Sequence, residues 1–242
     1  MTSKKFYTNK DGSVGYIKKG RKYTLHRPPR LSRDNWYGGS ETQNTRWVLE
    51  LLGHKKNGYF IDIGCNDPVN GNNTYVLERK YSWDGIVVEP NALYFGDIHH
   101  MRKCTKILGR PIFEHDEMVD FASVTEDWLQ GYSGIEKTLH RASRQKKYSI
   151  KKLQAMSPNT LVQECSVPEI FDYLKIDVEG AELNIIKNWP WDKAQPTLVS
   201  IESDPETTAK SVIEYMKEID YKQVKNPYCN VNYEFFFSHS SY

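Results

Sequence analysis

The sequence of 242 residues is poor in cysteine and lacks the spacings of common cysteine sites. No two of its cysteines form a C-x-x-C pair, which excludes the usual zinc-site spacing and a dense disulfide framework. The four residues are Cys65, Cys104, Cys165 and Cys229. Their wide separation predicts reduced thiols in an intracellular protein.

Long apolar runs and a strong net charge are also missing. No segment approaches the ~18 apolar residues needed to cross a bilayer, and the polar N-terminus lacks the apolar centre of a signal peptide. The 33 lysines and arginines nearly balance the 31 acidic residues and leave a net charge of +2, so we expect no nucleic-acid partner. These absences predict a cytoplasmic globular protein with no transmembrane segment.

The chain does contain an alternation of strand and helix patterns after a basic N-terminal arm. We assign the arm to residues 1–38 and a single folded domain to residues 39–242. Short apolar runs predict buried strands at residues 58–64, 85–89, 106–113, 171–177 and 197–202. Helical spacing between the runs predicts βαβ units, and therefore a doubly wound, mostly parallel α/β sheet. Residues 221–225 and 233–238 predict a closing hairpin.

Local signals predict where several elements begin. Ser40-x-x-Gln43 matches a capping box, and Asn72 and Asn73 are candidate caps for a following helix. Asp204 stands before a proline and predicts a helix N-cap. Residues 118–124 predict a fourth strand, whose direction, parallel or antiparallel, is left open.

Two strand ends carry polar residues that suit an adenosine cofactor. The loop after the first strand has a single glycine, Gly64, and not the G-x-G-x-x-G pattern of a dinucleotide site. Asp67 in the same loop would repel a phosphate. Glu89 ends the next strand, where a carboxylate can accept hydrogen bonds from both hydroxyls of a ribose. S-adenosylmethionine has no phosphate and carries a sulfonium and an ammonium, so this acidic loop favours it over NAD or ATP.

Four stretches of the chain resemble one enzyme family. They are Gly58-Tyr-Phe-Ile-Asp-Ile-Gly-Cys-Asn-Asp67, Asn73-Thr-Tyr75, Trp83-Asp-Gly-Ile-Val-Val-Glu-Pro90 and Asp172-Tyr-Leu-Lys-Ile-Asp-Val-Glu-Gly-Ala-Glu182. Together they resemble the FkbM-type methyltransferases, and the last stretch is the most specific. The resemblance implies a Rossmann-like class I methyltransferase sheet, S-adenosylmethionine as cofactor, and an activity that in many members O-methylates sugars or natural products.

The resemblance also implies which residues bind the cofactor. They are Asp62, Gly64, Asn66, Asp67, Glu89 and Pro90. Asp62, Gly64 and Asn66 would line the methionine part of the cofactor, and Glu89 would bind the ribose. From the residues alone, Asp62 can instead brace its loop, and Gly64 can serve as a plain tight turn.

The candidate catalytic residues are carboxylates at the ends of the later strands. Asp177 ends one strand, Glu179 opens the following helix, and Glu202 ends the next strand. Neighbouring strands lie roughly 5 Å apart, so these side chains are expected to converge. Converged carboxylates hold Mg²⁺ or Mn²⁺, with Asp177 and Glu202 as the candidate ligands, or they share a proton so that one acts as a base. The sequence leaves both chemistries open, and Asp177 can also serve as a helix cap.

The segment of about residues 125–160 is polar and basic and predicts an insertion that carries a helix. It has two interpretations. One is a solvated charged face. In the other, His140, Arg141 and Arg144 bind an anionic acceptor such as a nucleotide-linked or phosphorylated sugar.

These observations predict a S-adenosylmethionine-dependent O-methyltransferase. Its acceptor is expected to be a sugar hydroxyl of a glycan or glycoconjugate, methylated by in-line transfer with help from a carboxylate or a metal. The alternative is a non-catalytic module on the same fold that binds carbohydrate or RNA. A nicotinamide-dependent dehydrogenase is a more distant alternative, because the glycines of a dinucleotide loop are missing.

Overall fold

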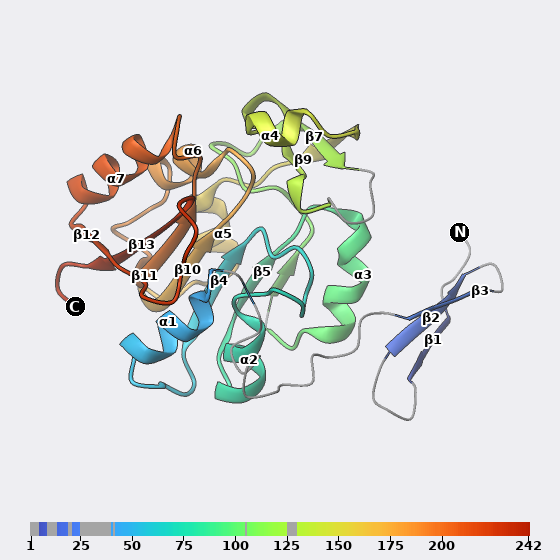
Figure 1. Cartoon of the computed structure of the whole chain (residues 1–242), viewed down its shortest axis with the longest axis horizontal. Helices are drawn as coiled ribbons and strands as arrows, with labels where there is room; N and C mark the ends of the chain where they lie inside the picture. The colour runs from blue at the N-terminus through green and yellow to red at the C-terminus, as the bar shows by residue number, and fades with distance from the viewer. Residues whose placement is uncertain are drawn as a thin grey trace.

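A computed structural model contains a central seven-stranded sheet (Figure 1). The structure describes residues 5–8, 14–18, 21–24, 40, 42–104, 106–124 and 130–242. The strands of the sheet are β4 (Tyr59–Ile63), β5 (Asp84–Val88), β6 (Lys106–Leu108), β10 (Ile170–Ile176), β11 (Gln195–Glu202), β12 (Tyr221–Val224) and β13 (Glu234–His239). They lie in the order β12-β13-β11-β10-β4-β5-β6.

Most neighbouring strands in this sheet are parallel. The exceptions are the two pairs made by β13, which is antiparallel to both β11 and β12. This arrangement confirms the predicted Rossmann-like, doubly wound sheet with an antiparallel C-terminal hairpin. The chain builds outward from β4 to β6 and then returns to place β10 on the other side of β4. Ligands of such sheets bind beyond the carboxyl ends of the strands at this switch point.

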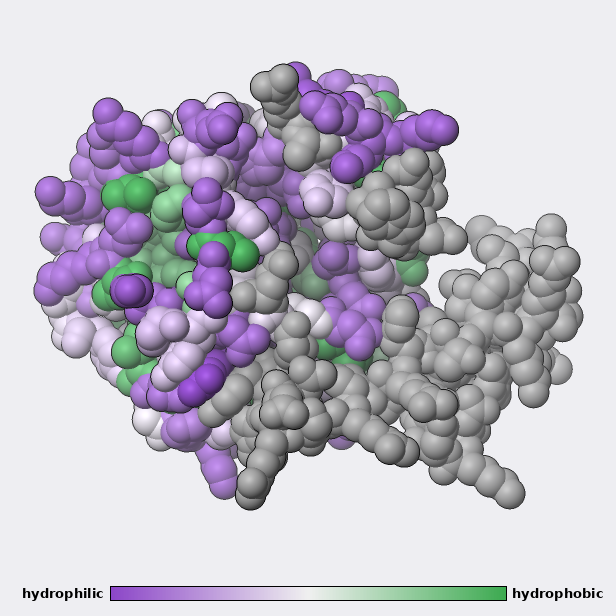
Figure 2. Space-filling view, viewed as in Figure 1, coloured by the Kyte–Doolittle hydropathy of each residue, from purple (hydrophilic) through white to green (hydrophobic). Residues whose placement is uncertain are grey.

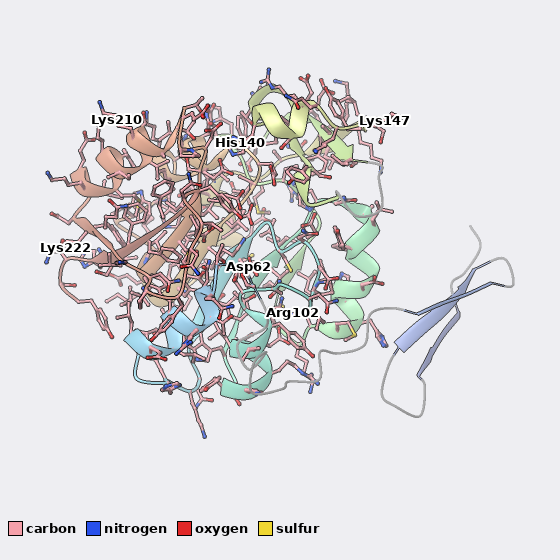
Figure 3. The ribbon with its side chains drawn as sticks, in the orientation of Figure 1. Asp62, Arg102, His140, Lys147, Lys210 and Lys222 are labelled. Atoms are coloured by element: carbon pink, nitrogen blue, oxygen red, sulfur yellow. The ribbon has the colours of Figure 1, made fainter. Side chains whose placement is uncertain are left out.

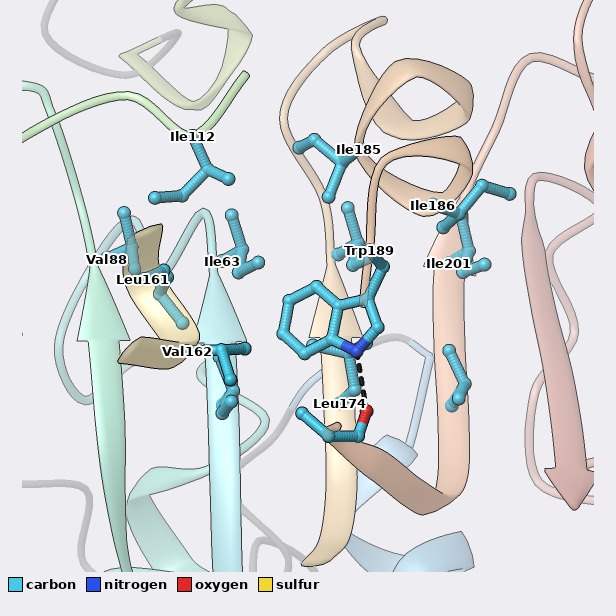
Figure 4. Packing of buried hydrophobic residues seen from close by; sticks show 14 of the residues in the cluster. Ile63, Val88, Ile112, Leu161, Val162, Leu174, Ile185, Ile186, Trp189 and Ile201 are labelled. Carbon is cyan, nitrogen blue, oxygen red and sulfur yellow. Dashed lines mark hydrogen bonds between the residues drawn. The ribbon is translucent and has the colours of Figure 1, made fainter. Parts of the chain in front are cut away.

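Helices cover both faces of the sheet. They are α1 (Asn44–Leu51), α2 (Tyr75–Tyr81), α3 (Ala92–Met101), α5 (Pro158–Glu164), α6 (Glu182–Lys187) and α7 (Ala209–Glu218). Successive side chains of a strand point to opposite faces. Phe60 of β4 therefore packs with residues of α1, α2 and α3, whereas Ile61 and Ile63 pack with residues of α5, α6 and α7. Figure 4 shows this second layer, where Trp189 also donates a hydrogen bond to the carbonyl of Ala194 at 2.7 Å.

Residues 118–124 form a strand, as predicted, but this strand does not join the central sheet. They form β7 (Met118–Val124), which pairs antiparallel with β8 (Gly134–Ile135) and β9 (Tyr148–Gln154) in a separate three-stranded sheet. Buried Val119 and Phe121 pack there in a small core of their own. The predicted insertion therefore carries strands as well as the short helix α4 (Arg141–Arg144). Its residues 125–129 lie outside the described part of the chain.

Two predicted helix starts differ from the structure. The capping box does not form, because α1 begins at Asn44 after a left-handed Gln43, and the Ser40 hydroxyl contacts Thr42 instead. The helix expected directly after Asp204 begins later, as α7 at Ala209. Asp204 instead caps the turn that precedes α7, where its carboxylate accepts a hydrogen bond from the Glu206 amide at 2.8 Å.

Within the predicted N-terminal arm, the backbone forms a small antiparallel sheet. Its strands are β1 (Lys5–Thr8), β2 (Val14–Lys18) and β3 (Arg21–Thr24). The rest of the arm, residues 1–4, 9–13, 19–20 and 25–38, lies outside the described residues.

Candidate functional site

A cavity of about 720 Å³ lies beyond the carboxyl ends of β4, β5, β10 and β11. Backbone hydrogen bonds join the first residues of these loops to the ends of the neighbouring strands. The Gly64 amide donates to the carbonyl of Val88 at 3.0 Å, and the Asp177 amide donates to the carbonyl of Ile63 at 2.9 Å. The cavity therefore occupies the place where the topology predicts a ligand site.

One end of the cavity is built from the loops after β4 and β5. Of the residues predicted to bind a cofactor, those that line it are Gly64, Asn66, Asp67, Glu89 and Pro90. Gly64 has a φ of 90°, and a Cβ at this position would lie 1.7 Å from the carbonyl oxygen of Asp177. Only glycine fits this approach, which brings the first loop against the end of β10.

Glu89 holds the first loop in place from the end of β5. Its side chain is buried, and its two oxygens accept hydrogen bonds from the amides of Asn66 and Asn91, each at 2.7 Å. Burial raises the pKa of Glu89 to about 7, although these two hydrogen bonds act in the opposite direction.

Asp62 lies beneath the cavity and is not among the residues that line it. Its side chain is fully buried in the interior (Figure 3), where it accepts a hydrogen bond from the Thr74 hydroxyl at 2.6 Å. This contact braces the start of α2, and the predicted contact of Asp62 with a cofactor stays a prediction.

At the other end of the cavity, three carboxylates converge. One carboxylate oxygen from each of Asp177, Glu179 and Glu202 lies within 4.8 Å of the other two. The expected convergence of these strand ends is therefore present, while their roles stay predictions. Glu179 has a left-handed backbone, with φ of 63°, which is unusual for a residue with a side chain.

Charge is distributed unequally within this cluster. The buried Lys175 ammonium donates to Asp177 Oδ2 at 2.8 Å. Burial, together with the Asp177 carboxylate, raises the pKa of both Glu179 and Glu202. Near neutral pH, Glu179 and Glu202 therefore favour the protonated form unless a cation joins them.

Glu234, which was not among the predicted site residues, lines the same cavity. It begins β13 and pairs with Glu202 across β11 and β13. Because β13 is antiparallel, its first residue lies at the same edge of the sheet as the last residues of the parallel strands. Burial raises the pKa of Glu234 to about 7, with Lys175 acting in the opposite direction.

Comparison with known proteins places the chain in a family. Residues 62–223 match the family model of the methyltransferase FkbM domain. The chain belongs to the FkbM methyltransferase family. No match was found among the curated proteins. Among solved structures, the chain is similar to the METTL16 MTase domain, with a TM-score of 0.44 and 14% sequence identity over 98% of this chain and 86% of that one.

Membership in this family implies that the protein transfers methyl groups from S-adenosylmethionine. No described helix of this FkbM methyltransferase combines the length and the apolar character needed to cross a membrane.

Two of the three substrate residues predicted in the basic insertion of this FkbM methyltransferase have described side chains, and one of these two lines the cavity. His140 lines it, and its Nε2 lies 3.7 Å from Glu182 Oε2. The guanidinium of Arg144 donates to backbone carbonyls of residues 137 and 139 and does not line the cavity. The side chain of Arg141 lies outside the described part. Much of the described surface near β9 is hydrophilic in Figure 2, and the solvated-face interpretation stays a prediction.

The insertion also braces the acidic cluster, which the sequence analysis missed. Buried Ser143 donates a hydrogen bond to Glu179 Oε2 at 2.7 Å, and the His140 amide donates to the Glu179 carbonyl at 3.0 Å. Glu182 is buried and accepts hydrogen bonds from the amides of Val178 and Gly180, each at 3.0 Å. No sequence spacing links Ser143 to Glu179, because the contact joins residues 36 positions apart.

Proposed function

We propose that this chain is a S-adenosylmethionine-dependent O-methyltransferase that acts on a sugar hydroxyl of a glycan or glycoconjugate. The observation that carries the proposal is one cavity with two unlike ends. The loops around Gly64 and Glu89 form one end, and the carboxylates of Asp177, Glu179 and Glu202 converge at the other. A cofactor and an acceptor bound in this cavity would meet between them.

The cofactor end suits S-adenosylmethionine by shape and by charge. The tight turn at Gly64 brings the first loop against the end of β10, and Asp67 and Glu89, which line this end, offer acidic side chains to a sulfonium and an ammonium. Glu89 stands at the end of β5, which is the predicted ribose position. Pro90 lines the cavity beside it.

Methyl transfer needs positioning and the removal of one proton. The acceptor oxygen attacks the methyl carbon, the carbon–sulfur bond breaks, and its electron pair stays on sulfur as S-adenosylhomocysteine leaves. The hydroxyl proton passes to the Asp177 carboxylate, which the Lys175 ammonium holds in position.

The same side chains also fit a divalent cation. Three carboxylates that each offer one oxygen within 4.8 Å of the others match the hard oxygen ligands that Mg²⁺ and Mn²⁺ prefer. Asp177 and Glu202, joined by Glu179, would hold the ion, which would lower the pKa of the acceptor hydroxyl. Methyl transfer measured with and without a chelator distinguishes this metal chemistry from proton sharing, because only the metal-dependent reaction would be lost.

The charge of the acceptor end favours an uncharged hydroxyl over an anionic sugar. Carboxylates surround this end of the cavity, whereas Lys175 contacts Asp177 and Arg144 contacts backbone carbonyls. Among the described residues that line the cavity, a phosphorylated or nucleotide-linked acceptor would therefore find only His140 as a cationic partner beside Lys175, and the Nε2 of His140 lies 3.7 Å from Glu182 Oε2.

The division of roles is tested by calorimetry with S-adenosylhomocysteine. We expect Glu89→Ala to weaken binding by about tenfold or more, because the first loop loses the acceptor of the Asn66 amide. Asp177→Ala is expected to retain binding and to lose turnover. Equal loss of binding in both variants would contradict this division, and no heat of binding to the folded, unaltered protein would contradict the cofactor assignment.

The acceptor is tested by transfer of label from S-adenosylmethionine. Neutral glycans and their phosphorylated counterparts are incubated with the protein, with and without chelator. We expect label on a neutral glycan hydroxyl. Label on phosphorylated sugars alone would contradict the acceptor assignment, and activity lost to chelator and restored by Mg²⁺ or Mn²⁺ would assign the cluster to a metal.

A further inference from the structure

A buried polar network lies behind the loop between β4 and α2, and the chemistry proposed above does not use it. At its centre is Arg102, which follows α3 and has a fully buried side chain (Figure 3). Its Nε donates to Glu78 Oε2 at 2.8 Å, its Nη2 to the Thr74 hydroxyl at 2.9 Å, and its Nη1 to Asn72 Oδ1 at 3.2 Å. A guanidinium held on every side in this way has one fixed position.

Asn72 connects this network to the cavity. Its Oδ1 accepts hydrogen bonds from Arg102 and from the two backbone amides at the start of α2, at 2.9 and 2.8 Å. Three donors on one side assign that atom as the oxygen, so the amide nitrogen points the other way. There it donates to the carbonyl of Cys65 at 3.0 Å and to the carbonyl of Asp67 at 3.2 Å.

These two carbonyls flank Asn66, which is a constrained residue of the loop. Asn66 between them has a left-handed backbone, with φ of 54°, and its amide donates to Glu89 Oε2 at 2.7 Å. Two side chains from outside this turn therefore hold it, Glu89 through its amide and Asn72 through its carbonyls. Asn66, Glu89 and Asn72 all line the cavity.

We propose that Asn72, oriented by Arg102, is a positioning residue for the cofactor, because it fixes residues 64–67 in the shape that receives S-adenosylmethionine. This inference rests on the proposed function, which puts the cofactor at this loop. As a helix cap alone, Asn72 would need only its oxygen. Its nitrogen gives it a second task, which is to hold the cavity wall.

The substitution Asn72→Asp separates the two tasks. The new carboxylate keeps the oxygen that caps α2 and faces Arg102 with a full charge, which supports the fold. It also replaces the donor to the loop with an oxygen that repels both carbonyls. We expect calorimetry with S-adenosylhomocysteine to give a dissociation constant raised by about tenfold or more. The melting temperature is expected not to fall.

A purely structural role for Asn72 predicts the reverse, a lower melting temperature with unchanged affinity in the folded protein. Asn188→Asp makes the same chemical change at an exposed residue after α6 and is expected to change neither quantity. Asn72→Ser removes the donor without adding charge and is expected to show the same loss of affinity.

Wild-type affinity in either folded Asn72 variant would overturn the inference, and so would failure of both variants to fold. If the unaltered protein binds no S-adenosylhomocysteine, the proposed function fails, and the inference fails with it.

Discussion

At the scale of single residues, Gly64 joins the two ends of the candidate site. A Cβ at this position would lie 1.7 Å from the Asp177 carbonyl, and the backbone φ of 90° disfavours any side chain. We expect Gly64→Ala to lower the free energy of unfolding by more than about 4 kcal/mol, because the ends of β4 and β10 must move apart. Urea denaturation measures this loss.

Gly53→Ala is the matched control for this effect. Gly53 has a φ of 58°, but a Cβ there meets nothing within 4 Å. The backbone cost alone is about 1 kcal/mol. A loss in Gly64→Ala no larger than in Gly53→Ala would show that the loop after β4 can relax away from β10.

A second prediction at this scale concerns Ser143. Its hydroxyl is the donor that holds Glu179 Oε2 at 2.7 Å, and it comes from the insertion and not from the acidic motif. We expect Ser143→Ala to reduce kcat by about tenfold, since the hydrogen bond that fixes the position of the Glu179 carboxyl group is lost. The affinity for S-adenosylhomocysteine is expected to stay unchanged, because Ser143 lies outside the cofactor loops. Equal effects on kcat and on cofactor affinity would contradict a role through Glu179.

At the scale of elements, the turn between β10 and α6 depends on its buried carboxylate. Glu182 accepts hydrogen bonds from the amides of Val178 and Gly180 on either side of the left-handed Glu179. Glu182→Ala leaves both amides without this partner and is expected to cost about 2–4 kcal/mol of unfolding free energy. Glu182→Gln keeps an acceptor oxygen and is expected to lose less than half as much. The two variants are compared by urea denaturation, and equal losses would mean that the charge facing His140 matters more than the turn.

The elements also show which features follow from sequence and which do not. The strands β4, β5, β10 and β11 were predicted because short apolar runs bounded by polar residues carry their own signal, and parallel topology then brings their ends together. Residues 118–124 carry the same signal. The sheet that they join depends on the packing of Val119 and Phe121 against Ile135 and Ala181. The local sequence pattern does not predict this contact between distant segments.

The candidate site also contains residues that the sequence predicts and contacts that it does not. Gly64, Glu89 and Asp177 lie where strand ends predict them, since each follows or ends a parallel strand. Asp62 lies two residues before Gly64, within β4. Its side chain points into the interior, toward Thr74, and does not reach the cavity. The network of Arg102, and the contact of Ser143 with Glu179, join distant segments and leave no trace in spacing.

At the scale of the whole molecule, a net charge of +2 conceals an uneven distribution. Acidic groups gather at the cavity, whereas lysines of the insertion face solvent. Within the cavity, burial raises the pKa of Glu234 from its ordinary value of 4.5 to about 7. The folded protein therefore keeps a proton on Glu234 that the unfolded chain releases between these two pH values. Stability from this group is complete below pH 4.5 and is lost as the pH rises through 7.

Glu234→Gln removes this dependence, because an amide has the same shape and does not titrate. The unfolding free energy of the variant, minus that of the ligand-free wild type, is expected to grow between pH 4.5 and 7. It should then level off at no more than about 3 kcal/mol. Denaturation in urea from pH 4 to 8.5 measures the difference, and the same change at exposed Glu214 separates it from any general response to pH. A difference that shrinks with rising pH would mean that Glu234 is ionised in the folded state, with Lys175 outweighing the cost of burial. In that case the ionised Glu234 carboxylate would add a negative charge to the acidic end of the cavity in the ligand-free protein.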